Sequence, residues 1–102
     1  MTSTFELLAD PTRRRVLDEL RKGQSSVGAL AVRLNMNQPA ISKQLRVLRE
    51  AGLASVQVDA QRRIYRLVPE GLREIDDWLV PYRKYWEERL DAMEQTLDSM
   101  ED

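Results

Sequence analysis

The chain has 102 residues, 42% of them hydrophobic and 32% charged, with a formal net charge of −1, which is typical of one soluble domain with a single modest core. It contains no cysteine and no histidine, which excludes disulfides, thiol redox switches, the usual zinc and copper ligands and Ser-His or Cys-His catalysis, so we expect no enzyme, no metal site and no cofactor. No apolar run reaches the ~20 residues that a membrane span needs, and no signal segment begins the chain, so we expect a cytoplasmic protein with no membrane partner.

The first predicted elements are two helices separated by a proline. A short helical segment contains Phe5 and Leu8 and ends near Asp10. Asp10 followed by Pro11 is an N-cap with a proline at the first helical position, so a second helix is expected to run to about Lys22.

Residues 26–52 predict two further helices joined by a tight turn. Ser26 is expected to cap the third helix, and the turn begins at Asn35, which should adopt a left-handed conformation. Asn37 is a good N-cap for the fourth helix, and Gly52 is placed to end that helix, also in a left-handed conformation. A helix, a short turn and a second helix form a helix-turn-helix.

The fourth helix has one apolar and one polar face. Ile41, Leu45 and Leu48 recur at i, i+4 and i+7 and are expected to pack inward. The other face offers amide, hydroxyl and basic groups, which suit the DNA major groove, where glutamine pairs with adenine and arginine with guanine. A solvated face without a binding role is the alternative interpretation. The residues expected to contact DNA from this helix are Gln38, Pro39, Ser42, Lys43 and Arg46.

Lys43 is expected to contact phosphate rather than bases, and Ser25 and Ser26 could also hold a phosphate, although capping alone is favoured for one of them. Lys43 presents a flexible cation on the polar face of the fourth helix. Ser26 lies at a helix N-terminus, where backbone N–H groups can hold a phosphate. Capping of the third helix, without any DNA contact, is the alternative role for Ser26.

After the fourth helix the periodicity changes to that of strands. Apolar and polar residues alternate over residues 53–58, and residues 62–68 are expected to return as a second strand, so that residues 53–68 form a wing. The turn lacks Asn-Gly or Asp-Gly, so we expect a longer and more mobile loop. Arg62 and Arg63 lie at or near the tip, where they can reach phosphates or a narrow minor groove. A tip that only keeps the protein soluble is the alternative.

Pro69 closes the wing and opens a long final helix, which is expected to run to about Leu97. Its apolar residues recur at gaps of three and four, close to a heptad seam and more than a helix needs to cover its own domain. Pro81 interrupts this seam and should kink the helix. We interpret residues 1–9 and 69–102 as dimerisation helices. The residues expected in the dimer interface are Phe5, Leu8, Leu79, Tyr82, Trp86, Leu90, Met93 and Leu97.

The aromatic side chains of the final helix admit a second interpretation. They could line a ligand cavity, but packing in the core and the dimer is the favoured interpretation. The paired carboxylates of the same helix are most simply a solvated face rather than a metal site. The aromatic residues concerned are Trp78, Tyr82, Tyr85 and Trp86.

The near-zero net charge conceals an uneven distribution of charge. Residues 1–68 hold twelve Lys and Arg against six Asp and Glu, whereas residues 69–102 hold four against eleven. A basic body with an acidic tail favours polyanion binding at one end of the molecule.

Together these elements predict a mainly α fold with a small β-hairpin. We expect a single winged helix-turn-helix DNA-binding domain over residues 1–102, with four helices, two strands and a long C-terminal helix in that order. With its pieces in this order, the chain resembles the ArsR/SmtB family of bacterial winged-helix repressors along most of its length. The segments that carry the resemblance are Leu8–Arg13, Val27–Ala31, Gln38–Leu48, Ala51–Leu53 and Arg62–Leu67.

The resemblance implies a homodimer that holds its recognition helices over two half-sites of an inverted repeat in double-stranded DNA and represses by blocking the promoter. The best-known members of this family sense metals through cysteines of the third helix or Asp/His sets of the last. Because this chain has neither cysteine nor histidine, it resembles the metal-independent branch, and its residues name no inducer.

The leading functional hypothesis is therefore a sequence-specific DNA-binding transcriptional regulator, a homodimeric repressor located in the cytoplasm with the nucleoid. The alternative is a protein–protein interaction module that uses the basic face of the winged helix and the long acidic C-terminal helix. The uneven charge distribution is compatible with both, because the acidic tail could itself dock a partner.

Overall fold

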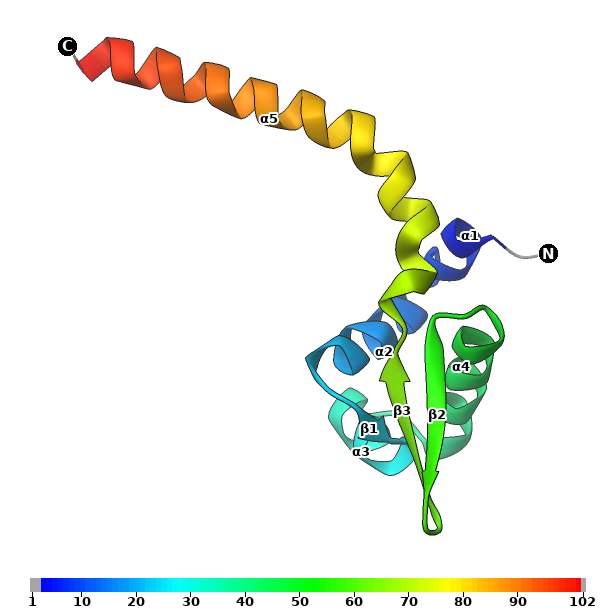
Figure 1. The fold of residues 1–102 in the computed structure, drawn as a ribbon. Coiled ribbons are helices and arrows are strands. Elements are labelled where there is room, and N and C mark those ends of the chain that lie inside the picture. Colours follow the sequence, from blue (N-terminus) through cyan, green and yellow to red (C-terminus); the bar gives the residue numbers. More distant parts are fainter. Residues whose placement is uncertain (1–2, 102) are drawn as a thin grey trace.

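The computed structural model describes residues 3–101, and Figure 1 shows one long helix projecting from a body of shorter elements. The molecule extends over 65 × 31 × 22 Å. The fold is mainly helical with a small β-hairpin, as predicted. Its elements are α1 (Thr4–Leu8), α2 (Pro11–Lys22), β1 (Ser25–Ser26), α3 (Val27–Leu34), α4 (Gln38–Glu50), β2 (Ala54–Asp59), β3 (Arg62–Leu67), the 3₁₀ turn η1 (Pro69–Leu72) and α5 (Arg73–Glu101).

The helices α2, α3 and α4 begin and end at the residues whose local chemistry predicts it. Asp10, Ser26 and Asn37 each accept a hydrogen bond from a backbone N–H in the first turn of the helix that follows, at 2.8 to 3.2 Å. A cap of this kind stabilises a helix by about 1 kcal/mol. Asn35 (φ 54°) and Gly52 (φ 80°) adopt the predicted left-handed conformation at the ends of α3 and α4.

The core is centred on the apolar stripe of α4. Ile41, Leu45 and Leu48 are completely buried, as are Leu30 of α3 and Leu53 before β2. Burying one such side chain stabilises the fold by about 1.5–3 kcal/mol. The stripe therefore fixes the orientation of α4 and leaves its polar face on the surface.

The sheet contains one more strand than the sequence predicts. Its order is β1-β3-β2, with antiparallel pairing throughout, and Ser25 of β1 lies opposite Tyr65 of β3. The predicted order of elements must be corrected accordingly, because β1 precedes α3. Two consecutive serines show neither alternation nor β-branching, so this strand had no local signal. It forms because the chain entering α3 passes beside β3.

The wing turn is shorter than expected. Asp59 pairs with Arg62, which leaves only Ala60 and Gln61 between the strands, so the prediction of a longer loop is wrong. Ala60 has φ 58° and supplies the positive φ that Asn or Gly usually supplies in a two-residue turn. The ladder between β2 and β3 is thus complete up to the tip of the wing.

The final helix starts later and ends later than predicted. A single 3₁₀ turn, η1, follows Pro69, and α5 runs from Arg73 to Glu101 rather than to about Leu97. Pro81 lies inside α5 without ending it, and Figure 1 shows the helix bending in its yellow part, which contains this proline. No helix in the described part of the chain combines the length and the apolar composition that crossing a membrane requires.

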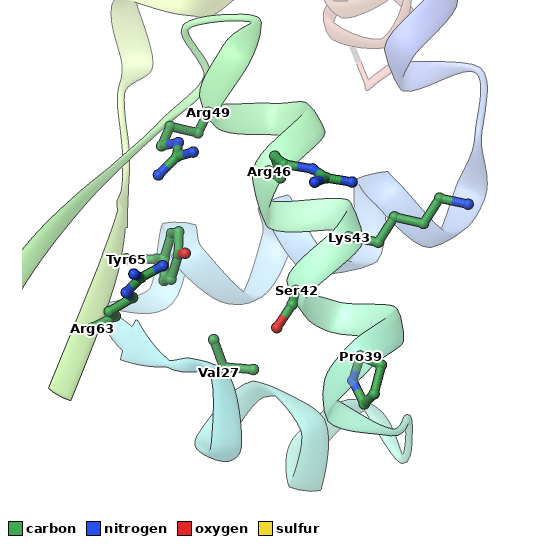
Figure 2. Close-up of a pocket in the computed structure, with 8 residues that line it drawn as sticks. All are labelled: Val27, Pro39, Ser42, Lys43, Arg46, Arg49, Arg63 and Tyr65. Atoms are coloured by element: carbon green, nitrogen blue, oxygen red, sulfur yellow. The ribbon is translucent and has the colours of Figure 1, made fainter. Parts of the chain in front are cut away.

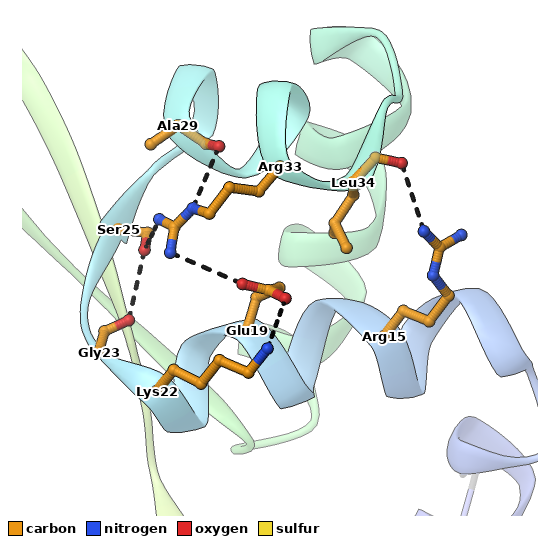
Figure 3. Close-up of polar contacts among 8 residues, drawn as sticks. All are labelled: Arg15, Glu19, Lys22, Gly23, Ser25, Ala29, Arg33 and Leu34. Carbon is orange, nitrogen blue, oxygen red and sulfur yellow. Dashed lines mark hydrogen bonds and ion pairs between the residues drawn. The ribbon is translucent and has the colours of Figure 1, made fainter.

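A polar network connects α2, α3 and β1 on the side of the body shown in Figure 3. Glu19 of α2 forms ion pairs with Lys22 at 3.1 Å and with Arg33 of α3 at 3.6 Å. Arg33 also donates to the hydroxyl of Ser25, which is buried and itself donates to the carbonyl of Gly23 at 3.3 Å. Arg33 therefore engages groups of its own chain at a partly exposed site, and the network holds the short strand β1 in place.

Replacing Arg33 with methionine is expected to lower the free energy of unfolding by about 1 kcal/mol, because hydrogen bonds to Ser25 and to the carbonyl of Ala29 and an ion pair with Glu19 are lost from a partly exposed site. Methionine keeps the apolar stem, so packing changes little. Urea unfolding followed by circular dichroism measures the change. The control is Arg21→Met, which removes an exposed arginine of the same region. Equal losses in the two variants would contradict a role for the network.

Candidate nucleic-acid interface

The polar face of α4 is presented to solvent as the sequence predicts. The five residues expected to contact DNA from this helix are all exposed, whereas the stripe on the other face is completely buried. A helix whose apolar face is packed in the core and whose polar face is exposed can enter a major groove. The exposed residues are Gln38, Pro39, Ser42, Lys43 and Arg46.

A cleft of about 330 Å³ lies between α4, the first residue of α3 and the wing strand β3, as Figure 2 shows. It brings together four cationic side chains with one serine and one tyrosine, and none of the acidic residues that the structure describes lines it. Its lining residues are Val27, Pro39, Ser42, Lys43, Arg46, Arg49, Arg63 and Tyr65.

Five residues of this lining were predicted from the sequence to contact DNA, and the structure adds Val27, Arg49 and Tyr65. Arg49 follows Arg46 by three residues on the exposed face of α4, so the helical period contained a signal for it. Tyr65 gave no such signal, since alternation along β3 assigns it to the buried face. It is indeed only 5% exposed, yet it lines the cleft.

Three of the predicted DNA-contact residues lie outside the lining of the cleft. Gln38 is exposed at the start of α4. Ser26 accepts a hydrogen bond from the backbone N–H of Ala29, so its capping role is confirmed. Arg62 is exposed beside the wing turn, opposite Asp59 in the ladder.

Several cations elsewhere in the body are engaged by the protein itself. Arg13 Nε donates to Gln44 Oε1 at 3.1 Å, while Arg14 and Arg15 donate to the carbonyls of the last residues of α1 and α3. Arginine at these carbonyls satisfies groups that have no partner within the helix. Within residues 3–101, by contrast, the lysine and arginines of the cleft form no ion pair. Within the described part of the body, the cations without an ion pair or a hydrogen bond to the protein therefore lie mainly on α4 and the wing, with Arg21 of α2 as an exception.

The apolar seam of the final helix is exposed. Phe5 of α1 packs edge-on against Trp78 of α5, with ring centroids 5.7 Å apart, and Trp78 contacts Tyr82 at 5.0 Å. Leu8 and Leu79 are half-buried. The other residues predicted for the interface remain 40% to 61% exposed, and these are Phe5, Tyr82, Trp86, Leu90, Met93 and Leu97.

Comparison with known proteins identifies relatives over most of the chain. The profile of the family described as bacterial regulatory protein, arsR family, matches residues 10–56. HTH-type transcriptional regulator Rv2034 of Mycobacterium tuberculosis is 36% identical over 95 residues, which cover 93% of this chain and 86% of the relative. Transcriptional repressor SdpR of Bacillus subtilis is 32% identical, with coverage of 80% and 91%.

Solved structures agree with the sequence relatives. A possible transcriptional regulator for arsenical resistance superimposes with a TM-score of 0.71 at 36% identity, covering 91% of this chain and 94% of that one. The homodimeric winged helix-turn-helix DNA-binding domain of Mb0332 from Mycobacterium bovis superimposes with a TM-score of 0.63 at 27% identity, covering 81% and 78%.

Proposed function

This chain belongs to the ArsR family of bacterial regulatory proteins and is a DNA-binding transcriptional regulator, and we propose that it acts as a homodimeric repressor that binds an inverted repeat and blocks access to a promoter. The observation that carries the proposal is the exposed polar face of α4 beside a cleft lined with unpaired cations. Its relatives are regulators rather than enzymes.

The homodimer is supported by the exposed seam of α5. Side chains such as Trp86, Leu90 and Leu97 are at least half exposed on a helix that projects beyond the body (Figure 1). A surface helix with this pattern is stable in water only when another apolar surface covers it. The related Mb0332 domain is homodimeric, which agrees with self-association.

The inverted repeat follows from the symmetry of such a dimer. A two-fold axis places two copies of α4 in opposite orientations, so each copy meets the same half-site on opposite strands. The half-sites are then expected about one helical turn apart, roughly 10 base pairs from centre to centre. Repression follows because a protein over one face of promoter DNA excludes other proteins from it.

The direct test is a titration of the protein into the DNA upstream of its own gene, followed by fluorescence anisotropy at several salt concentrations. We expect tight binding to one inverted repeat, weakening steeply with salt because phosphate counterions are released. A scrambled duplex of equal length serves as the control. Equal affinity for the two duplexes would contradict sequence-specific regulation through this site.

The two kinds of predicted contact are expected to respond differently to mutation. Arg46→Ala should reduce discrimination between the operator and the scrambled duplex about tenfold, because an arginine that pairs with guanine contributes about 1–3 kcal/mol of discrimination. Arg62→Ala should weaken binding to both duplexes alike, because a phosphate contact carries no sequence information. The same anisotropy titration measures both variants. Equal losses on the two duplexes for Arg46→Ala would exclude direct readout by this residue.

A further inference from the structure

The hydroxyl of Tyr65 occupies an unusual position at the surface of the cleft. The residue is 5% exposed in the middle strand of the sheet, with Ser25 and Val56 as its neighbours in the ladder. Its hydroxyl forms no hydrogen bond with the described residues. Every buried polar side-chain atom of these residues does have a hydrogen-bond partner, so the oxygen of this hydroxyl is not itself buried. The ring is therefore held in the core while its hydroxyl remains accessible at the cleft.

The side chains of α4 around this hydroxyl point in two directions. Figure 2 shows Arg49 and Ser42 turned toward β3, where Arg63 and Tyr65 lie, whereas Lys43 and Arg46 extend to the other side of the helix. The helix thus divides its polar face between the wing side and the opposite side.

The wing side presents groups that all donate hydrogen bonds. The two guanidinium groups can only donate, and the two hydroxyls of Ser42 and Tyr65 can donate as well. Without a carboxylate in the lining, a group that accepts hydrogen bonds and carries negative charge meets no repulsion there. Phosphate fits this chemistry best, since guanidinium binds it through two parallel hydrogen bonds.

We propose that the side of the cleft formed by Ser42, Arg49, Arg63 and Tyr65 binds one phosphate of the DNA backbone. This inference rests on the proposed function, because it assumes that α4 and the wing face DNA together. The DNA backbone then passes between α4 and the wing. The bound phosphate sets the depth and the angle at which α4 lies in the major groove of the DNA. Arg46, on the other side of α4, is left for the bases of the major groove, and Lys43 beside it for another phosphate. Tyr65 is a positioning contact that carries no sequence information.

The first test compares Tyr65→Phe with the wild-type chain. Because the hydroxyl has no hydrogen-bond partner within residues 3–101, the melting temperature should stay unchanged, while affinity falls about tenfold on the operator and on the scrambled duplex alike. The salt dependence should also be unchanged, since no charge is lost. A variant that binds both duplexes as tightly as the wild type overturns the proposal.

The second test removes charge with Arg49→Gln and uses Arg21→Gln, an exposed arginine of α2, as the charge-matched control. Arg49→Gln should reduce the slope of log affinity against log salt by about 0.9 for each protomer, whereas the control should leave it nearly unchanged. Equal slopes for the two variants contradict a phosphate contact at Arg49.

A scan with methylphosphonates identifies the phosphate itself. Single uncharged replacements along the operator should reveal one position whose penalty in the wild type largely disappears in the Tyr65→Phe and Arg49→Gln variants. Penalties that stay the same in the variants at every position overturn the assignment. Because the effects of Tyr65→Phe on affinity and of Arg49→Gln on the salt slope can also be measured on the scrambled duplex, loss of operator preference alone would refute the repressor and leave the phosphate contact measurable. A wild-type chain that binds no duplex would refute both.

Inorganic phosphate provides the remaining arm of the experiment. It is titrated into the DNA-free protein while the arginine side-chain N–H signals are followed by NMR. If inorganic phosphate binds the wild type and not Arg49→Gln, while this variant binds duplexes normally, the cleft serves a free oxyanion and the DNA assignment is wrong.

Discussion

Replacing Gly71 with alanine is expected to lower the free energy of unfolding by about 3 kcal/mol, at the upper end of the range for overpacking. A Cβ atom on Gly71 would lie 2.4 Å from the carbonyl oxygen of Gly52 and 2.8 Å from Cδ2 of Leu53. The oxygen belongs to the backbone, and Leu53 is completely buried, so neither atom has room to yield.

The location of this contact extends its consequences beyond stability. Gly71 lies in η1, which leads into α5, and Gly52 is the left-handed residue just beyond the end of α4. The backbone of the two segments is also joined by a hydrogen bond from Val68 N to the carbonyl oxygen of Leu53 at 2.9 Å. An added methyl group must therefore shift α5 relative to α4, and we expect weaker operator binding together with the loss of stability.

Urea unfolding and anisotropy titration measure both effects of Gly71→Ala. Gly23→Ala is the matched control, because a Cβ atom there meets nothing within 4 Å and the φ of 162° is open to any residue. Similar behaviour of the two variants would show that the contact between η1 and the end of α4 does not constrain the fold.

The second large effect is expected from Leu90→Glu, which should dissociate the proposed dimer and weaken operator binding by about 100-fold or more. Leu90 is 59% exposed in the middle of the seam on α5. In a dimer the new carboxylate would be removed from water without a partner, which is strongly unfavourable. Affinity falls because each half-site must then be bound independently, without the gain that a linked second site provides.

Light scattering coupled to size-exclusion chromatography measures the mass of the Leu90→Glu variant, and anisotropy measures its affinity for the operator. Gln95→Glu adds the same charge to the same helix outside the predicted seam and should remain dimeric. A Leu90→Glu variant that keeps both the mass and the affinity of the wild type would exclude α5 as the dimer interface.

The proposed division of α4 into a side that reads bases and a side that binds phosphate accounts for the number of hydrogen-bond donors on this one helix. Lys43 and Arg46 extend away from the wing, while Ser42 and Arg49 turn toward it (Figure 2). In the proposed complex, sequence discrimination and positioning are then carried by different residues of the same helix, so mutations should separate the two properties.

Local chemistry in the sequence was sufficient to predict most of the helical framework. The caps at Asp10, Ser26 and Asn37 and the left-handed Gly52 depend on interactions between residues a few positions apart, which a linear sequence displays directly. The apolar stripe of α4 is equally local, because its period is that of the helix itself. These features also predicted which residues of α4 face solvent.

Only the tertiary structure decided which residues lie beside α4. The strand β1 exists only because β3 passes next to it, and Tyr65 lines the cleft because its position in the sheet, opposite Ser25 and Val56, brings it to the cleft beside α4. The need for glycine at position 71 arises from a contact with residue 52, nineteen positions earlier. Such contacts join segments that are distant along the chain, and their geometry is set by packing of the core, so no pattern of neighbouring residues records them.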